Sequence, residues 1–539
     1  MKRSPAGERR VVWIPAALVF VTLFALCTRL LQARESLWLD ELHTAWTATG
    51  PWAAVVARSA MGNQSPLFFA LEWLLTRVFG AGELVLRIPS LIAGVLLPIA
   101  LYALVRAWTR SAWLGLLPAW LVALDPQAAY FGTEARPYAL VQLGAVLHVW
   151  LFVTLTDRPT LWKRVGFIGG AAFLFHLHYT TVLLLAAEAI WYLATRRGRQ
   201  GSYRLTSLAV DLAAVAILAL PAAPIISGIF ARRDNWRVFV GRPPLWVGVL
   251  MLPWCAFALS LMLLVTAWRG AQRDSSRRDV PSLVPGAAVV VCWLTVPLCL
   301  AWLATTTDVA RLLTPRYIAA SAPAALVLLA LAINGIPARR VRLLAGAAFA
   351  LAGTVASPAL RYLVADGRLI DWRTDDWRGA VAWFNQQPRH DKGIVLLRSL
   401  LIESDGLRAH PRDSALIAYS RYPLTSLYRI EPPDRVAPLP RTDPEREIRT
   451  LPPFRGDSTN WLVFQGDLAS ARIAELDVLD RLLKTTGRAW RIDAQAAFGT
   501  VHVARFELVS SLLSLTRCGS AVNTRCIRRS PGPRRSSAT

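Results

Sequence analysis

Long apolar runs, separated by short basic segments, fill the first two-thirds of the chain. A helix needs about 20 mainly apolar residues to cross a bilayer. By that criterion we predict about eleven spans, at residues 11–31, 86–105, 112–130, 137–156, 165–178, 179–194, 205–228, 245–267, 285–304, 317–335 and 343–363. The run from 165 to 194 is continuous, and we divide it at His178. The pattern predicts a polytopic α-helical membrane domain over residues 1–363.

Composition supports this prediction and excludes other classes. Of 539 residues, 54% are hydrophobic and only 18% are charged, too few to cover a soluble protein of this size. The net charge of +25 comes largely from Arg residues clustered between apolar runs, which is the positive-inside pattern and not a nucleic-acid-binding face. We therefore expect the bilayer, and no nucleic acid, as a partner. Lys2, Arg3, Arg9 and Arg10 place the N-terminus in the cytoplasm.

The first outer loop, residues 32–85, contains a segment that does not fit the spanning pattern. Residues 66–79 are too few to span and include Glu72 and Arg77. We predict an amphipathic helix in the outer interface. The first apolar stretch is long and lacks an Ala-x-Ala site before the polar segment, so a cleaved signal peptide is not expected.

After residue 363 the chain becomes polar and rich in Pro, Asp and Arg. Short apolar runs at 393–398 and 461–465 predict buried strands, and helical spacing appears at 376–384 and 469–483. We predict a small extracytoplasmic α/β domain over residues 364–510. The stretch 511–539 is rich in Arg, Ser and Pro and predicts a disordered basic tail.

An acidic pair, Asp40 and Glu41, follows the first apolar run beside Trp38. Carboxylates at a membrane surface are costly to desolvate and favour a functional site. We interpret Asp40 as a catalytic base and Glu41 as a second catalytic residue; the alternative for Glu41 is that it only orients Asp40. The structural alternative is that Asp40 caps a helix or pairs with Arg34.

Several Arg residues fall on the predicted outer side, against the positive-inside bias. An anionic lipid head group explains them, because the planar guanidinium matches phosphate oxygens. The candidates for binding such a phosphate are Arg87, Arg136, Arg311 and Arg316. As alternatives, Arg136 forms a local salt bridge with Glu134, and Arg311 and Arg316 anchor a helix at the interface.

Several blocks of this sequence together resemble one known family. They are Trp38-Leu-Asp-Glu41, residues 66–80, 86–94, 130–140 and 176–180, Pro315-Arg-Tyr317 and Asp376-Trp-Arg378. In this order they resemble the dolichyl-phosphate-mannose protein mannosyltransferase superfamily over most of residues 30–380. Bacterial members use undecaprenyl-phosphate sugars, and the lipid A aminoarabinose transferases are relatives.

The resemblance implies a GT-C fold with an active site facing away from the cytoplasm. It implies that Asp40 is the base that helps an acceptor attack the anomeric carbon of the sugar. The candidates for a supporting role in the site lie in these blocks or next to them: Glu134, Tyr138, His178, Tyr179 and Gln64. Of these, His178 has a structural alternative as a hydrogen-bonded packing residue.

Gln64 stands where relatives commonly carry an acidic residue or a His-Pro-Pro sequence. Because Gln is a poor metal ligand, divalent-metal dependence is in doubt, and we predict no metal and no cofactor. A phosphate-linked donor is already activated, so the absence of a nucleotide-binding motif agrees with this chemistry.

We therefore predict a transferase of the inner (plasma) membrane that moves a sugar from a polyprenyl-phosphate donor to an extracytoplasmic lipid, glycan or protein. A transporter or flippase for a lipid-linked sugar is the alternative. It would place ionisable residues near mid-bilayer and broken helices in repeated halves, whereas the notable charges here are expected at helix ends. A third reading is a non-catalytic envelope scaffold, with a merely structural acidic pair. Neither the sugar nor the acceptor can be named from the sequence.

Overall fold

The computed structural model describes residues 5–195, 203–236, 240–271, 286–367, 375–388, 393–450 and 459–509. The chain divides into two compact units. The first, here the helical unit, comprises Met1–Arg34 and His43–Trp372; the second, the sheet unit, comprises Glu35–Leu42 and Arg373–Thr539. The predicted tail, 511–539, lies outside the described residues.

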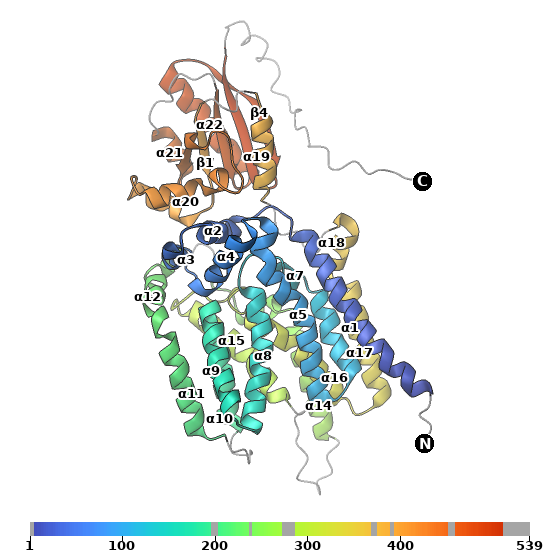
Figure 1. The fold of residues 1–539 in the computed structure, drawn as a ribbon. Helices are drawn as coiled ribbons and strands as arrows, with labels where there is room; N and C mark the ends of the chain where they lie inside the picture. The colour runs from blue at the N-terminus through green and yellow to red at the C-terminus, as the bar shows by residue number, and fades with distance from the viewer. Residues whose placement is uncertain are drawn as a thin grey trace, which may run out of the picture. The chain divides into compact units, whose positions relative to one another are not determined.

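The helical unit is an all-helical bundle (Figure 1). Its α-helices are α1 (Pro5–Gln32), α3 (Val55–Met61), α4 (Pro66–Phe79), α5 (Glu83–Thr109), α6 (Ala112–Ala123), α7 (Pro126–Phe131), α8 (Tyr138–Asp157), α9 (Leu161–Leu177), α10 (Val182–Thr195), α11 (Leu205–Ala219), α12 (Ala223–Ala231), α13 (Leu245–Met251), α14 (Cys255–Ala271), α15 (Ala287–Thr306), α16 (Ala322–Gly335), α17 (Arg339–Val355) and α18 (Pro358–Asp366). Short 3-10 helices are η1 (Trp52–Ala54), η2 (Tyr179–Thr181), η4 (Leu220–Ala222), η5 (Arg233–Trp236) and η6 (Ala319–Ser321). Helix α2 (Leu39–Thr49) begins in the sheet unit and continues into the helical unit.

Every predicted span falls on an apolar helix or a pair of consecutive helices. Within the described residues, five helices are long and apolar enough to cross a membrane, and two bent pairs raise that number to seven. Three shorter apolar helices, Ala112–Ala123, Tyr179–Thr195 and Ala319–Gly335, coincide with further predicted spans. The number is lower than about eleven because several of the apolar runs fold as short or broken helices. The chain is a multi-pass membrane protein.

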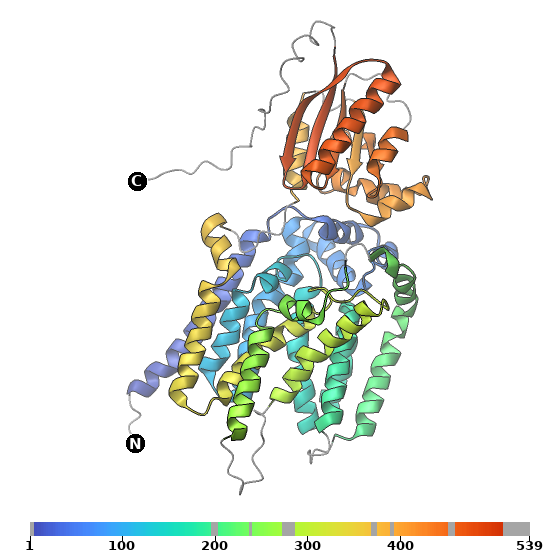
Figure 2. The ribbon, with the colours of Figure 1, turned by 180° about the vertical axis from the view of Figure 1, so that it is seen from behind.

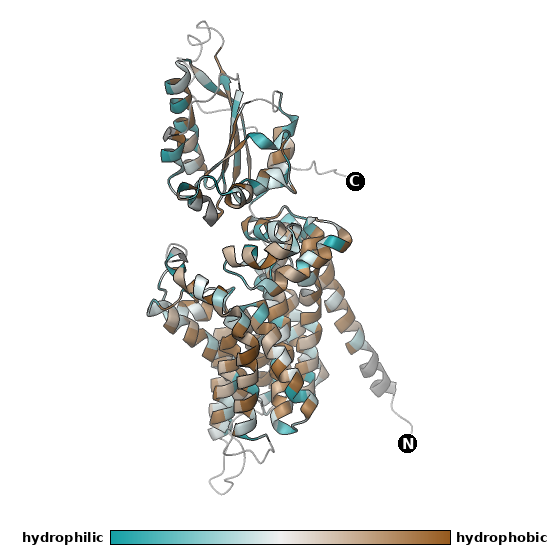
Figure 3. Cartoon of the chain, turned by 60° about the vertical axis from the view of Figure 1, so that its left-hand side comes forward, coloured by the Kyte–Doolittle hydropathy of each residue, from teal (hydrophilic) through white to brown (hydrophobic). Residues whose placement is uncertain are grey.

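The bundle is apolar both inside and outside. Helix α16 is its central element, since nearly all of its residues are buried, and it packs against α14, α15 and α6. Large apolar side chains such as Phe20, Ile217 and Leu264 are more than half exposed on the outer surface. Figure 3 shows this hydrophobic colour along the helices of the unit, and Figure 2 shows that α14 and α17 lie on the side opposite α8 and α9. An apolar surface of this extent is suited to lipid.

The helix boundaries confirm that the apolar run breaks at His178 and that residues 66–79 form a helix, while the interfacial position of that helix stays a prediction. The continuous apolar run breaks at His178, between α9 and η2. Residues 66–79 form α4, which starts at Pro66, a position where the missing N–H costs nothing. Its Glu72 is fully buried, and its Thr76 hydroxyl donates to the Ala48 carbonyl over 3.1 Å. The polar face of α4 therefore packs into protein.

The sheet unit is an α/β domain with five strands in the order β2-β1-β3-β5-β4. The strands are β1 (Val395–Arg398), β2 (Val436–Leu439), β3 (Thr459–Gln465), β4 (Trp490–Phe498) and β5 (Val501–Leu508), and the α-helices α19 (Trp377–Gln386), α20 (Ser414–Thr425), α21 (Pro444–Thr450) and α22 (Leu468–Thr486), with 3-10 helices η7 (Ile402–Arg408) and η8 (Pro433–Arg435). Strand β1 pairs in parallel with β2 and β3, while β5 is antiparallel to β3 and β4.

Both faces of this sheet are covered, which explains the apolar runs in the sequence. On one face the core includes Leu462, Phe464 and Val478 of α22. On the other, Phe384 of α19 packs on Trp461 with ring centroids 4.5 Å apart. Every residue of the central strand β3 is buried, as is typical of a strand with no solvated face. The predicted strands at 393–398 and 461–465 are thus confirmed.

Candidate functional site

A cavity of about 220 Å³ in the helical unit brings together several predicted site residues. Its wall includes Gln64, His178, Tyr179 and Arg311, which come from three places far apart in the sequence. They come from the turn before α4, the break between α9 and α10, and the loop after α15. Apolar side chains of α12, such as Ile226 and Phe230, complete the wall. A mostly apolar cavity with a few polar groups is the ordinary form of a ligand site.

His178 lies at the centre of an aromatic cluster beside this cavity. Its ring is 5.5 Å from that of Tyr138 and 5.6 Å from that of Tyr317, centroid to centroid. Its Nδ1 is 2.7 Å from the hydroxyl oxygen of Thr180, and Arg136 is near enough to interact with it electrostatically. The structure therefore joins three predicted residues, Arg136, Tyr138 and His178, with Tyr317, for which the sequence analysis proposed no role.

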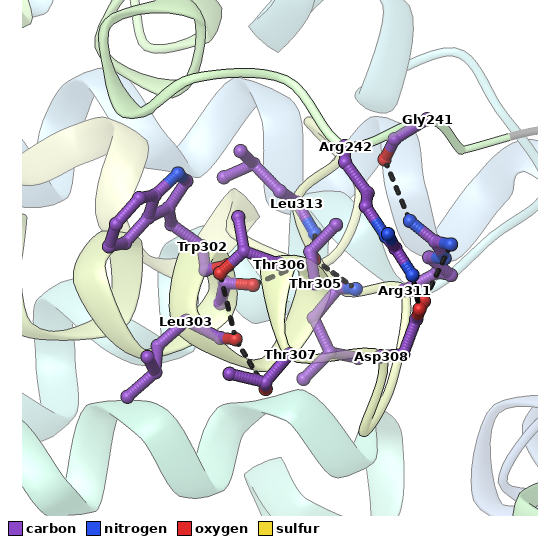
Figure 4. A network of polar contacts seen from close by, with 12 residues as sticks. Gly241, Arg242, Trp302, Leu303, Thr305, Thr306, Thr307, Asp308, Arg311 and Leu313 are labelled. Carbon is purple, nitrogen blue, oxygen red and sulfur yellow. Dashed lines mark hydrogen bonds and ion pairs between the residues drawn. The ribbon is translucent and has the colours of Figure 1, made fainter.

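Arg311 is already engaged in an ion-pair network at the cavity wall (Figure 4). Its guanidinium lies 2.6 Å from Asp308, which also pairs with Arg242, and donates to the Gly241 carbonyl over 3.3 Å. Two guanidinium groups share one carboxylate here, so the network keeps a net positive charge. These contacts give Arg311 a structural role that the sequence analysis did not propose, because they hold the loop after α15 against Gly241.

Arg233, also on the cavity wall, was not among the predicted phosphate ligands. Its guanidinium lies 4.5 Å above the Phe230 ring and donates to the Phe230 carbonyl over 3.1 Å. The only signal in the sequence was a basic residue in a predicted outer loop. Arg316 precedes Tyr317 and is half-buried, but it does not line this cavity.

Arg87 occupies a different place. It is fully buried on α5 and donates to the backbone carbonyls of Gln32 and Ala33, over 3.5 and 3.0 Å. These carbonyls end α1, so Arg87 satisfies acceptors that a helix terminus leaves open. The structure shows a helix-capping contact for this residue, and Arg87 is not part of the cavity wall.

Glu134 and Arg136 lie in the turn between α7 and α8. Glu134 is fully buried and Arg136 is 4% exposed. The Arg136 backbone N–H donates to the Glu134 carbonyl over 2.7 Å, and Ser90 donates its hydroxyl to the Arg136 carbonyl over 2.8 Å. These bonds fix the turn before Tyr138 and so position the ring that contacts His178.

Asp40 and Glu41 belong to the sheet unit. The Leu42 N–H donates to the Trp38 carbonyl over 2.9 Å, which makes Trp38 the residue that precedes the first turn of α2. Glu41 reaches back to the Trp38 N–H with an oxygen at 3.3 Å. This is the reciprocal contact of a capping box, so Glu41 has a structural role at the start of α2. Asp40, in the same turn, is half-buried.

Among the described residues, no group of three or more His, Cys, Asp or Glu side chains could hold a metal ion. The polar character of the site comes from Arg, Tyr, Gln and single carboxylates. These side chains can bind an anion and hold or move a proton.

One polar pair, His148 with Glu188, was not foreseen. His148 stands in the middle of α8, its Nδ1 2.9 Å from Glu188 of α10, and its Nε2 is 3.2 Å from the Phe167 carbonyl of α9. Both side chains are 2% exposed. The expectation that notable charged groups lie only at helix ends is wrong here, because the pair joins three apolar helices well inside their length. The sequence did not predict this contact, because His148 and Glu188 are single polar residues in separate apolar runs.

Comparison with known proteins gives a family match for part of the chain. Two solved structures are similar: ArnT from Cupriavidus metallidurans bound to undecaprenyl phosphate, with 13% identity and a TM-score of 0.49, and its apo state, with 14% identity and a TM-score of 0.42. Each comparison covers 93% of this chain and 98% of the other. No curated protein matches the sequence. Residues 63–226, which contribute half of the cavity wall, match the family model described as dolichyl-phosphate-mannose-protein mannosyltransferase. The resemblance seen in the sequence blocks is thus confirmed over residues 63–226, where the chain matches this family model.

Proposed function

We propose that this protein is a membrane glycosyltransferase that moves a sugar from a polyprenyl-phosphate donor to an extracytoplasmic acceptor. The observation that carries the proposal is the family match over residues 63–226, because that segment supplies Gln64, His178 and Tyr179 to the cavity. The family description names a polyprenyl-phosphate sugar as donor. The apolar wall of the cavity suits a prenyl chain, and its arginines suit a phosphate.

In this proposal Asp40 is the general base. It takes the proton of the acceptor hydroxyl or amine as the acceptor atom forms a bond to the anomeric carbon. The bond from that carbon to the phosphate oxygen breaks, and its electron pair leaves with the lipid phosphate. Arg311, Arg316 and Arg136 stabilise the negative charge that develops on the phosphate. Glu41 supports Asp40 through the first turn of α2. The active site and the sheet unit face the extracytoplasmic side.

The test is transfer from a panel of radiolabelled polyprenyl-phosphate sugars to envelope fractions by the purified full-length protein. Loss of a general base typically costs 10²- to 10⁴-fold in rate, so Asp40→Asn should lower turnover by about this factor. Asp467→Asn is the matched control, because Asn retains the cap that Asp467 makes to Ser470 of α22. Full turnover by Asp40→Asn, or consumption of no donor by the wild-type protein, would contradict the proposal.

Besides the two bent helix pairs, the His148–Glu188 pair is the observation among the described residues that favours a transporter instead. A proton or ion pathway needs such a pair to exchange with water, and both side chains are sealed from it at 2% exposure. The pair ties α8, α9 and α10 together, and we assign it to packing. If His148→Gln abolished movement of a lipid-linked sugar across vesicle membranes while leaving the thermal stability of the protein unchanged, the transporter interpretation would replace ours.

A further inference from the structure

The segment Glu35–Leu42, which carries Asp40, groups with a domain more than 300 residues later in the sequence. It joins Arg373–Thr539 in one compact unit, although its chain neighbours on both sides belong to the helical unit. Leu37 is fully buried and Ser36 is 5% exposed. A short segment stays with a domain so distant in sequence only if specific contacts hold it there, and the structure shows such contacts.

Two of these contacts involve the first residues of the segment. The Leu37 backbone N–H donates to the Tyr428 hydroxyl over 2.7 Å, and Tyr428 is itself 6% exposed. The Ser36 hydroxyl oxygen accepts the Arg378 backbone N–H over 3.3 Å, in the first turn of α19. The segment is thus fixed both to the turn after α20 and to the start of α19.

The third contact is nearest to the candidate base. The Asp375 carboxylate lies close enough to the backbone N–H of Leu39, the residue before Asp40, for this N–H to stabilise the charged form of the carboxylate. Leu39 is the first residue of α2, where a helix has no internal partner for its N–H groups. A carboxylate from another element therefore lies beside the helix start that Glu41 caps from within.

Asp375 is itself held rigidly on the sheet. Gln465, at the end of β3, donates its amide to one carboxylate oxygen over 2.6 Å, and Thr500 donates its hydroxyl to the other. The Gln465 amide oxygen in turn accepts the Leu400 N–H over 2.8 Å, so this amide cannot reverse without losing a bond. Both carboxylate oxygens of Asp375 thus accept a hydrogen bond from the sheet.

Electrostatics agree with a close approach of the two carboxylates. Burial raises the pKa of Asp375 above its ordinary value, and the nearby charge of Asp40 raises it further. The hydrogen bonds from Thr500 and Gln465 and the nearby Leu39 backbone N–H act in the opposite direction and favour the charged form.

We propose that Asp375 is a positioning residue: together with Tyr428 it lets the sheet unit hold the segment Glu35–Leu42 and so fixes the orientation of Asp40. The catalytic meaning of this inference rests on the proposed function, but the mechanical claim does not. It assigns to the C-terminal domain a task in building the active site, through contacts to the backbone on the N-terminal side of the base.

The experiment measures hydrogen exchange of the full-length protein in nanodiscs. Asp375→Asn removes the negative charge beside the Leu39 N–H and replaces one acceptor oxygen by an NH2 group. Exchange of peptides covering residues 36–42 should therefore rise on the order of tenfold or more. Tyr428→Phe removes the acceptor for the Leu37 N–H and should raise exchange of the same peptides by a smaller factor. Peptides of β1 and α22 are the internal reference, and Asp467→Asn is the matched control variant.

The reciprocal variant Asp375→Asn/Gln465→Glu tests the chemistry of the contact. In this variant the carboxylate introduced by Gln465→Glu can accept hydrogen bonds from the Leu400 N–H and from the amide introduced by Asp375→Asn. Hydrogen exchange of residues 36–42 should therefore return toward the wild-type rate. Wild-type exchange at 36–42 in both single variants would overturn the proposal. If Asp375→Asn raises exchange throughout the chain, the outcome is decided by Tyr428→Phe, which must then loosen residues 36–42 selectively.

The kinetics of sugar transfer distinguish a positioning role of Asp375 from a purely structural role. Asp375→Asn should lower kcat with the KM for donor unchanged, and the reciprocal variant should restore kcat. An unchanged kcat despite a loosened segment would refute the positioning role. If Asp40→Asn proves fully active while Asp375→Asn still loosens residues 36–42, the proposed function fails and the mechanical contact stands.

Discussion

The ion pair between Arg164 and Asp211 makes an asymmetric prediction about stability. Arg164, at the start of α9, binds Asp211 of α11 through three contacts of 3.0, 3.1 and 2.6 Å. The Tyr203 hydroxyl donates to the same carboxylate over 2.8 Å. The Arg164 side chain is 33% exposed, whereas that of Asp211 is fully buried. The two partners therefore differ in what is left behind when the other is removed.

Arg164→Met leaves a fully buried carboxylate with no cation, which typically costs about 3–5 kcal/mol. Asp211→Asn leaves an Arg that can turn toward water, and the new amide can still accept from Tyr203, so the cost should be about 1–3 kcal/mol. The double variant Arg164→Met/Asp211→Leu removes both charges and should be less destabilised than Arg164→Met alone.

The assay is thermal unfolding of the full-length protein in detergent, followed by tryptophan fluorescence at one scan rate, since membrane proteins often unfold irreversibly. The expected order of melting temperature is wild type, then Asp211→Asn, then Arg164→Met, with the double variant above Arg164→Met. Equal melting of the two single variants, or additive loss in the double variant, would refute the claim that the buried carboxylate determines the cost.

Two further predictions concern the sheet unit. Glu41→Ala should destabilise the start of α2 by about 1 kcal/mol and speed hydrogen exchange of the Trp38 amide. Glu41→Gln can still accept the bond from that amide, so its exchange and its transfer rate should stay close to those of the wild type. Loss of transfer in Glu41→Gln with normal exchange would instead show a direct catalytic role for Glu41. The pKa of His502 in β5 is lowered below its ordinary value of 6.5, chiefly by burial. As pH falls, His502 therefore takes up a proton in the unfolded chain before it does so in the folded protein. Its contribution to the free energy of unfolding is lost as pH falls from about 6.5 through the pKa of the folded state. Exchange protection of β5 should therefore decrease between pH 7 and pH 5 in the wild type and less so in His502→Gln, and identical pH profiles would contradict this.

Local sequence was sufficient for most of the elements. Apolar runs located every spanning helix or helix pair, and the strands at 393–398 and 461–465 followed from runs bounded by polar turns. The break at His178 could be placed because the run around it is too long for one helix. The number of full spans could not be read in the same way, since length and hydropathy do not reveal where an apolar run bends.

The candidate site was only partly accessible from the sequence. Arg311 and His178 were identified by their type and their place between helices, and the structure brings both to one cavity. Arg87 had the same features, yet it caps α1 inside the bundle. Residue type and approximate depth do not tell which acceptors an Arg will meet, so the contact of Arg87 with the end of α1 could not be read from the sequence, and its role as a phosphate ligand stays a prediction.

By itself, the sequence determined that this is a multi-pass membrane protein with a polar α/β domain, because hydrophobic period and run length are local properties of the chain. Tertiary structure alone decided that His148 meets Glu188 and that residues 35–42 belong with the C-terminal domain. The bond from Leu37 to Tyr428 joins residues 391 positions apart. A hydrogen bond depends on two atoms reaching about 3 Å, and no local pattern records which distant segment will supply the second atom.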